Sequence, residues 1–128
     1  MPAGVYDFEV EQGASFKPIL QWKNKDTGVP YNITGCEIRM QVRKAQQQPV
    51  LLEVTTTNSK FVITDAANGK FQMLLSAADT SLLTSKEAVY DIEVAFPDGP
   101  PQTVVRILKG KFLVDPNITQ IADEPVLS

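Results

Sequence analysis

Acidic side chains recur at every second position near the start of the chain, at Asp7, Glu9 and Glu11. Neighbouring carboxylates are the groups that general acid–base catalysis and calcium binding use. Residues two positions apart in an extended strand share one face, however, and the apolar residues between them would occupy the other face. We therefore interpret these carboxylates as the solvent-exposed face of a strand, not as a reactive pair.

Two further sites carry a weak chemical signature. Asp65, Asn68 and Gly69 resemble part of a calcium loop, but further acidic ligands and a bidentate glutamate are missing, which favours a plain turn. Cys36 is in phase with Ile38, and no base accompanies it, so we interpret it as a small core residue. The chain has no histidine, the commonest general base and transition-metal ligand. We expect neither an enzyme nor a protein that binds a metal or cofactor.

Three cations, Arg39, Arg43 and Lys44, form a short basic row. The acidic outer faces of residues 7–11 or 87–93 could complement this row, which makes it a candidate interaction site. The chain has 12 basic and 15 acidic residues and a net charge of −3. Nucleic-acid binding needs a clustered basic face, so we do not expect a nucleic-acid partner.

The overall composition is that of one globular domain. The chain has 128 residues, of which 43% are hydrophobic and 21% are charged, and its single cysteine excludes an internal disulfide. Residues 1–4 lack the basic and apolar regions of a signal peptide. No apolar run approaches the roughly 18–20 residues that a membrane span requires. We expect a soluble protein, made in a cytoplasm, without a membrane partner.

Residues 87–114 alternate in polarity on both sides of a turn-rich segment, which predicts a β-hairpin. One register satisfies the apolar and the charged pairs together. It places Val94 opposite Val105, Ile92 opposite Ile107, and Glu93 opposite Arg106. The sequence Lys109-Gly110-Lys111 interrupts the alternation and predicts a β-bulge there.

The remaining pattern predicts short strands with turns about every ten residues, which favours an antiparallel sandwich of about seven to nine strands. The further predicted strands cover residues 6–11, 16–22, 36–43, 50–56, 61–64 and 71–75. Pro18 lies inside one of them and predicts a sheet edge or a crossover. The capping-box spacing of Ser76 and Asp79 predicts a short helical turn near residues 77–83.

A shared period of two predicts which side chains point inward. The predicted inward row is Tyr6, Phe8, Val10, Leu20, Trp22, Ile38, Met40, Val42, Phe71, Met73, Leu75, Ile92, Val94, Val105 and Ile107. Residues 116–128 have no usable period, so we divide the chain into a sandwich domain, 1–115, and an extended C-terminal arm, 116–128. The arm has four apolar candidate interaction residues, Ile118, Ile121, Val126 and Leu127.

Residues 6–16, 34–43, 69–80 and 90–94 together resemble small virion structural proteins of tailed bacteriophages. They are also similar to the N-terminal β-sandwich of phage baseplate upper proteins and tail-fibre adaptors. This resemblance covers residues 6–114 and implies an all-β protein, a single antiparallel immunoglobulin-like sandwich that acts by assembly. In the longer relatives a fibre or receptor-binding region follows such a domain, and here Ser128 is the last residue, which favours a joining or decorating role.

The leading hypothesis is therefore a phage tail, baseplate or fibre-attachment component, located in the virion and made in the host bacterial cytoplasm. Its expected partners are other virion proteins and copies of itself. A capsid decoration or head–tail joining protein is an alternative in the same class. A small carbohydrate-binding module is the alternative from another class, and an exposed row of coplanar aromatic residues would support it.

Overall fold

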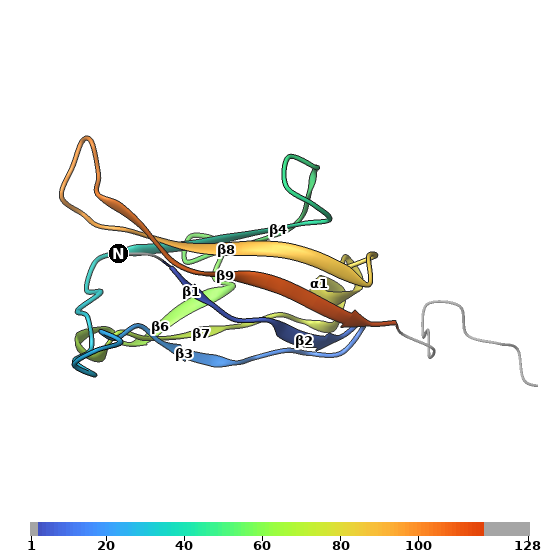
Figure 1. The fold of residues 1–128 in the computed structure, drawn as a ribbon, viewed down its shortest axis with the longest axis horizontal. Coiled ribbons are helices and arrows are strands. Elements are labelled where there is room, and N and C mark those ends of the chain that lie inside the picture. Colours follow the sequence, from blue (N-terminus) through green and yellow to red (C-terminus); the bar gives the residue numbers. More distant parts are fainter. Residues whose placement is uncertain (1–2, 117–128) are drawn as a thin grey trace, which may run out of the picture.

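The computed structural model describes residues 3–116, and in this range the chain is mostly β-structure with one short α-helix. The larger sheet has six strands: β1 (Gly4–Val5), β2 (Phe8–Glu11), β4 (Glu37–Arg43), β5 (Val50–Thr55), β8 (Glu87–Ala95) and β9 (Val104–Asp115). The smaller sheet has three: β3 (Ile19–Gln21), β6 (Phe61–Asp65) and β7 (Lys70–Met73). The two open sheets form two layers, an arrangement consistent with a β-sandwich (Figure 1).

The space between the layers is filled by the alternating apolar residues of the strands. Ten members of the predicted inward row are buried: Phe8, Val10, Ile38, Met40, Val42, Phe71, Met73, Leu75, Ile92 and Val94. Four others are half-buried: Leu20, Trp22, Val105 and Ile107. The prediction was wrong for Tyr6, which is 56% exposed.

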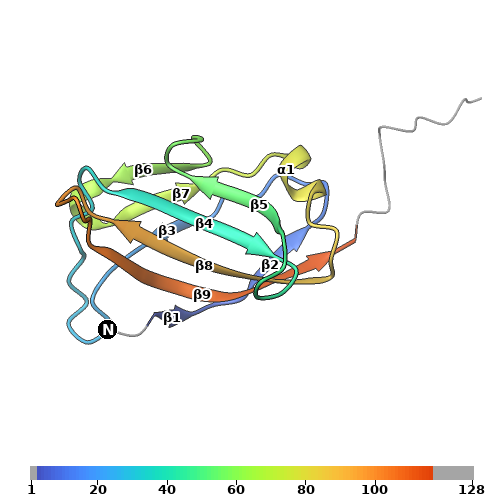
Figure 2. The same ribbon diagram turned by 90° about the horizontal axis from the view of Figure 1, so that it is seen from above.

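Strand pairing is mixed, so the prediction of a wholly antiparallel sandwich was wrong. The first strands β1 and β2 run parallel to the last strand β9, while β9, β8, β4 and β5 pair antiparallel in that order. Figure 2 shows β1 along one margin of the larger sheet and β5 along the other. Parallel strands need a long connection, and here that connection is the rest of the domain.

The predicted hairpin register is correct at its turn end and wrong farther along. Glu93 lies opposite Arg106 and Val94 opposite Val105, as expected. A register shift then occurs, so Ile92 lies opposite Leu108 and not opposite Ile107. The irregularity therefore falls at Ile107, two residues before the predicted bulge.

Gly110 has another role, because it lies where β1 and β2 pass β9. A Cβ at Gly110 would overlap the carbonyl of Tyr6. That carbonyl accepts a hydrogen bond from the Tyr90 hydroxyl at 2.6 Å, while the Asp7 Oδ1 accepts from the Lys111 amide at 3.0 Å. The Asp7 side chain thus substitutes for a backbone acceptor, and β1 and β2 are separated at Tyr6-Asp7. This break explains why Tyr6 leaves the predicted inward row.

The helical prediction is confirmed by α1 (Ala77–Ser81). Ser76 and Asp79 form both hydrogen bonds of a capping box. Asp79 is 8% exposed, and its Oδ1 also lies 2.7 Å from the Lys60 Nζ. Burial opposes ionisation of this carboxyl, but hydrogen bonds from Lys60 and Ser76 outweigh it and lower the pKa of Asp79.

The predicted arm, residues 116–128, lies outside the described residues from position 117 onward. Within residues 3–116, no helix is both long enough and apolar enough to cross a membrane.

Gly110→Ala should lower the free energy of unfolding by about 1–3 kcal/mol, because the new methyl group forces the Tyr6 carbonyl away from β9. Urea denaturation would measure the loss, and hydrogen exchange should show faster opening of β1 and β2. Gly4→Ala is the matched control, since its Cβ would meet Leu108 Cδ1 at an ordinary 3.5 Å. Equal effects of the two substitutions would contradict the close approach at Gly110.

Asp79→Asn should lower the free energy of unfolding at pH 7 by about 1–3 kcal/mol, because it removes the charge that Lys60 and the capping box stabilise. The folded-state pKa of Asp79 lies below its usual value, so its stabilising effect is present above the unfolded pKa and is lost as pH falls through the folded pKa. The difference in the free energy of unfolding between the variant and the wild type should therefore become smaller as the pH falls. Denaturation curves across pH 2–7 would measure it (roughly the range in which carboxylates titrate), with Asp26→Asn in an exposed turn as the control.

Candidate interaction surfaces

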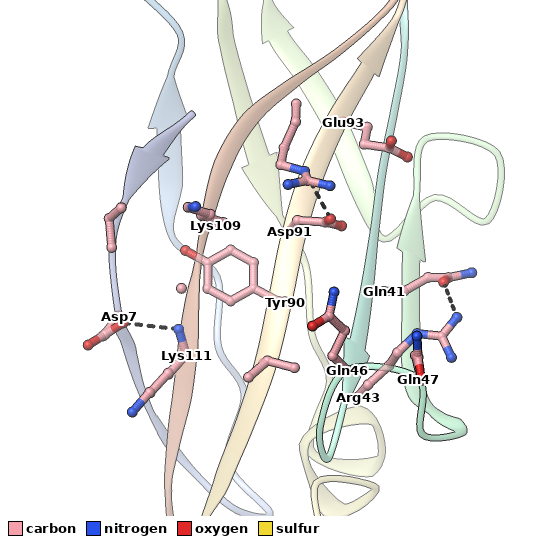
Figure 3. Close-up of a pocket in the computed structure, with 14 residues that line it drawn as sticks. Asp7, Gln41, Arg43, Gln46, Gln47, Tyr90, Asp91, Glu93, Lys109 and Lys111 are labelled. Atoms are coloured by element: carbon pink, nitrogen blue, oxygen red, sulfur yellow. Dashed lines mark hydrogen bonds and ion pairs between the residues drawn. The ribbon is translucent and has the colours of Figure 1, made fainter. Parts of the chain in front are cut away.

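The outer face of the larger sheet carries a broad polar groove of about 760 Å³. Strands β4, β8 and β9 form its floor, and the loop between β4 and β5 contributes Gln46 and Gln47 to one side (Figure 3). This loop and the loop between β8 and β9 extend beyond the outer face in the same direction (Figure 1). The charged lining residues are Asp7, Arg43, Asp91, Glu93, Arg106, Lys109 and Lys111.

Most of these charges are balanced by neighbours in the same sheet. Arg39 Nε lies 3.3 Å from Glu93 Oε1, and Arg106 Nε lies 3.2 Å from Asp91 Oδ2. Thus Glu93 and Arg106 are opposite each other, as predicted, but each forms its ion pair with a different residue. The Lys111 Nζ lies 2.6 Å from Glu87 Oε1, and this hydrogen bond raises the pKa of Lys111. The outer face therefore carries many charged side chains, but most of these charges are neutralised by ion pairs within the sheet.

The predicted basic row is not a continuous free surface. Arg39 is engaged with Glu93, and Arg43 donates hydrogen bonds to Gln41 Oε1 and to the Gln48 carbonyl. Lys44 is exposed where the loop after β4 begins. The acidic face of residues 87–93 thus complements Arg39 within the same chain, one of the two arrangements that the sequence left open.

The other sequence candidates occupy structural positions. Asp7, Glu9 and Glu11 are exposed, as expected. Cys36 is 7% exposed, and burial, reinforced by the negative charge of Asp98, raises the pKa of its thiol. Asp65 Oδ2 accepts a hydrogen bond from Asn68 at 2.9 Å in a turn. Across residues 3–116, the structure brings together no group of three His, Cys, Asp or Glu side chains able to hold a metal ion.

The aromatic side chains do not form an exposed row in the part of the chain that the structure describes. Trp22 and Tyr31 are half-buried and stack on each other, with ring centroids 4.2 Å apart. Trp22 also packs against the core, and its ring lies 6.0 Å from that of Phe96. Tyr6 is the one exposed aromatic residue between positions 3 and 116. The observation that would support a carbohydrate platform is therefore not found in this range.

Asn58 protects one edge of the larger sheet, a role that the sequence analysis missed. Its Nδ2 donates to the Glu53 carbonyl, and its Oδ1 accepts from the Thr55 amide, both at 3.0 Å. These backbone groups belong to the edge strand β5 and would otherwise be open to another strand. The Thr-Thr-Asn-Ser sequence after β5 signals a turn, but it does not show that the amide folds back onto the strand.

No protein family and no curated protein sequence matches this chain. The predicted arm residues Ile118, Ile121, Val126 and Leu127 lie outside the described residues.

Arg106→Ala should change the free energy of unfolding by less than about 1 kcal/mol, because Arg106 and Asp91 form an exposed ion pair with 55% and 39% of their side-chain surface accessible. Urea denaturation at low and high salt would measure the change. A loss above about 2 kcal/mol would show that the outer-face charges hold the sheet together and do not merely neutralise one another.

Proposed function

We propose that this chain is a non-enzymatic structural protein of a tailed-bacteriophage virion, at the tail, baseplate or fibre attachment, acting through protein–protein assembly. The sequence resemblance of residues 6–114 to small phage virion proteins is the origin of this proposal. The proposal includes a location in the virion after synthesis in the host bacterial cytoplasm, with other virion proteins and copies of this chain as partners.

The order of the strands is the observation that supports the proposal most directly. An immunoglobulin-like sandwich pairs its second, fifth and fourth strands in one sheet and its third, sixth and seventh strands in the other. With β5 counted as an added strand beside β4, the second, fifth and fourth strands are β3, β7 and β6, which form the smaller sheet. The third, sixth and seventh strands are then β4, β8 and β9, which lie side by side in the larger sheet. We therefore propose an immunoglobulin-like domain, in which β1 and β2 together act as the first strand. In the constant-type arrangement the first strand lies in the same sheet as the second, whereas here β1 and β2 pair with β9 in the larger sheet.

The surface of the domain is suited to contacts with extended partners. The groove on the larger sheet is broad and polar, and two loops rise beyond that face. The sheets are open, so they end in edge strands, where backbone groups are available to a partner. A capsid decoration or head–tail joining role would use the same features, and only the position in the particle separates these roles from a tail component.

Truncation after Asp115 should leave the sandwich folded, because every described strand and the helix end at or before that residue. The melting temperature should change little, whereas incorporation into phage particles should fall, since the removed segment holds the apolar arm residues. Calorimetry and quantification of the protein in purified particles would measure the two effects.

Replacement of residues 116–128 by a Gly-Ser segment of equal length is the matched control for chain length, and it should behave like the truncation. Cryo-electron microscopy of particles would locate the full chain, with density on the capsid favouring the decorating role. Unfolding of the truncated chain, or its full incorporation, would contradict an assembly role for the arm. Absence of the full chain from particles would overturn the proposed function.

A further inference from the structure

The edge strand β3 leaves backbone hydrogen-bonding groups open. Leu20 lies opposite Phe71, the Met73 amide donates to the Pro18 carbonyl, and the Trp22 amide donates to the Gly69 carbonyl. The backbone amides and carbonyls of the even-numbered residues of this strand therefore point toward β7, except that Pro18 has no N–H. Because antiparallel pairing alternates, the amides and carbonyls of Ile19 and Gln21 point away from β7, and within residues 3–116 they meet no partner.

Pro18 does not obstruct this open side. Its carbonyl faces β7, so its missing N–H also falls on the β7 side of the strand. The proline therefore weakens the existing ladder and leaves the outward donors of Ile19 and Gln21 in place.

The margins of the larger sheet and the β3 edge differ in their charge and in how far their backbone groups are capped. On the β3 side, Gln72 Nε2 donates to the Lys17 carbonyl at 3.1 Å, which leaves the backbone groups of Ile19 and Gln21 open. Asn58 covers the Glu53 carbonyl and the Thr55 amide on β5. The strand β2 presents the exposed carboxylates of Glu9 and Glu11. Capped backbone groups and charged side chains both oppose strand addition, and charged side chains oppose strands of like charge most strongly. The carboxylates of β2 therefore oppose an acidic strand, whereas the lysines beside β3 oppose a basic one.

The side chains around β3 define the kind of strand that would fit there. Ile19 is 67% exposed and lies in one row with Gln72 and Val62, which is 40% exposed. The exposed cations Lys17, Lys23 and Lys70 surround this row, and none forms an ion pair with a carboxylate in the described part of the chain. The strands β3 and β7 contain no acidic residue. The edge thus favours a partner strand with both aliphatic and acidic residues.

The chain itself contains such a segment. Residues 117–128 include Ile118 and Ile121, followed by Asp123 and Glu124, and they include no lysine or arginine. We propose that the open edge of β3 binds residues 117–128 of another copy of this chain as an added strand. Main-chain hydrogen bonds to Ile19 and Gln21 would supply affinity, and the lysines would select the acidic residues. This proposal rests on the proposed function, which brings copies of the chain together.

Disulfide trapping between two full-length variants tests the position of the contact. One variant carries Gln21→Cys and the other carries one added cysteine at one of positions 119–123, and the two are mixed under mild oxidation, with the native Cys36 buried in both. We expect a cross-linked heterodimer for at least one position. Val104→Cys, at an exposed site on the larger sheet, replaces Gln21→Cys as the control and should give no comparable product. If the Val104 control forms as much product, the proposal is overturned.

Charge reversal tests the proposed recognition in the full chain. The double variant Asp123→Lys with Glu124→Lys should weaken self-association by about tenfold or more, measured by sedimentation velocity. Ile19→Glu should do the same, while Val104→Glu, which also places an acid at an exposed aliphatic position, should not. A chain with Lys17→Glu and Lys23→Glu should regain association with the double variant. Every variant changes exposed or arm residues, and its melting curve would verify folding.

Three results would overturn the proposal. The first is that no heterodimer is trapped with a cysteine at any of the five positions 119–123, and the second is that Ile19→Glu leaves self-association unchanged. The third is that, when both cysteines are placed in one chain, the disulfide forms only within that chain. The last result would assign the segment to its own β3. Localisation of the chain in particles without any trapping would reject this contact and retain the proposed function. If the heterodimer is trapped but the chain is absent from particles, the contact is retained and the proposed function is rejected.

Discussion

The close approach of the first and the last strand at Gly110 is the constraint on which the rest of this sandwich depends. Because Gly110 lacks a side chain, the Tyr6 carbonyl can lie directly against β9. There it accepts a hydrogen bond from the Tyr90 hydroxyl at 2.6 Å. Burial, together with the nearby Asp7, raises the pKa of Tyr90, so this hydroxyl stays protonated and donates. The contact joins residues 84 positions apart and brings Phe8 and Val10 into the core. Closure of the domain therefore depends on one position that no side chain can occupy.

The two sheets use charge in different ways. On the larger sheet, Arg39, Arg106 and Lys111 each lie within 3.3 Å of a carboxylate oxygen, so most of the face is neutralised by its own strands. On the smaller sheet, lysines surround β3 without such pairs in the described range. Exposed ion pairs contribute little to stability, so the difference affects recognition more than folding. An acidic strand would meet Arg43 and Lys109 on the first face, beside the carboxylates of Asp91 and Glu93, whereas on the second face it would meet Lys17, Lys23 and Lys70 without an acidic residue on β3 or β7.

Local pattern was sufficient to predict most of the elements, because a strand with one buried face must alternate. The strand predicted over residues 36–43 agrees with β4 to within one residue, and the capping box at Ser76 and Asp79 is present. The errors involve contacts between distant residues. Parallel pairing of β1 and β2 with β9, the shift at Ile107 and the return of Asn58 onto β5 each depend on where another segment lies. Tyr6 continues the alternation of its strand, and only Gly110, far along the chain, explains its exposure.

The candidate site shows the same division between local and distant information. The sequence identified Arg39 and Arg43 as interaction residues because they share a strand face, but their partners Glu93 and Gln48 lie on other elements and occupy both of them. Pro18 predicted a sheet edge or a crossover for its strand, and β3 is an edge strand, but which of its backbone groups are open follows from the strand pairing. In a three-stranded sheet two of the three strands are edge strands, so each of them needs its own protection against strand addition. The cap on β5 and the carboxylates of β2 would disfavour an acidic strand at the larger sheet, whereas the lysines beside β3 would favour one, so charge gives the edges of this domain different partners.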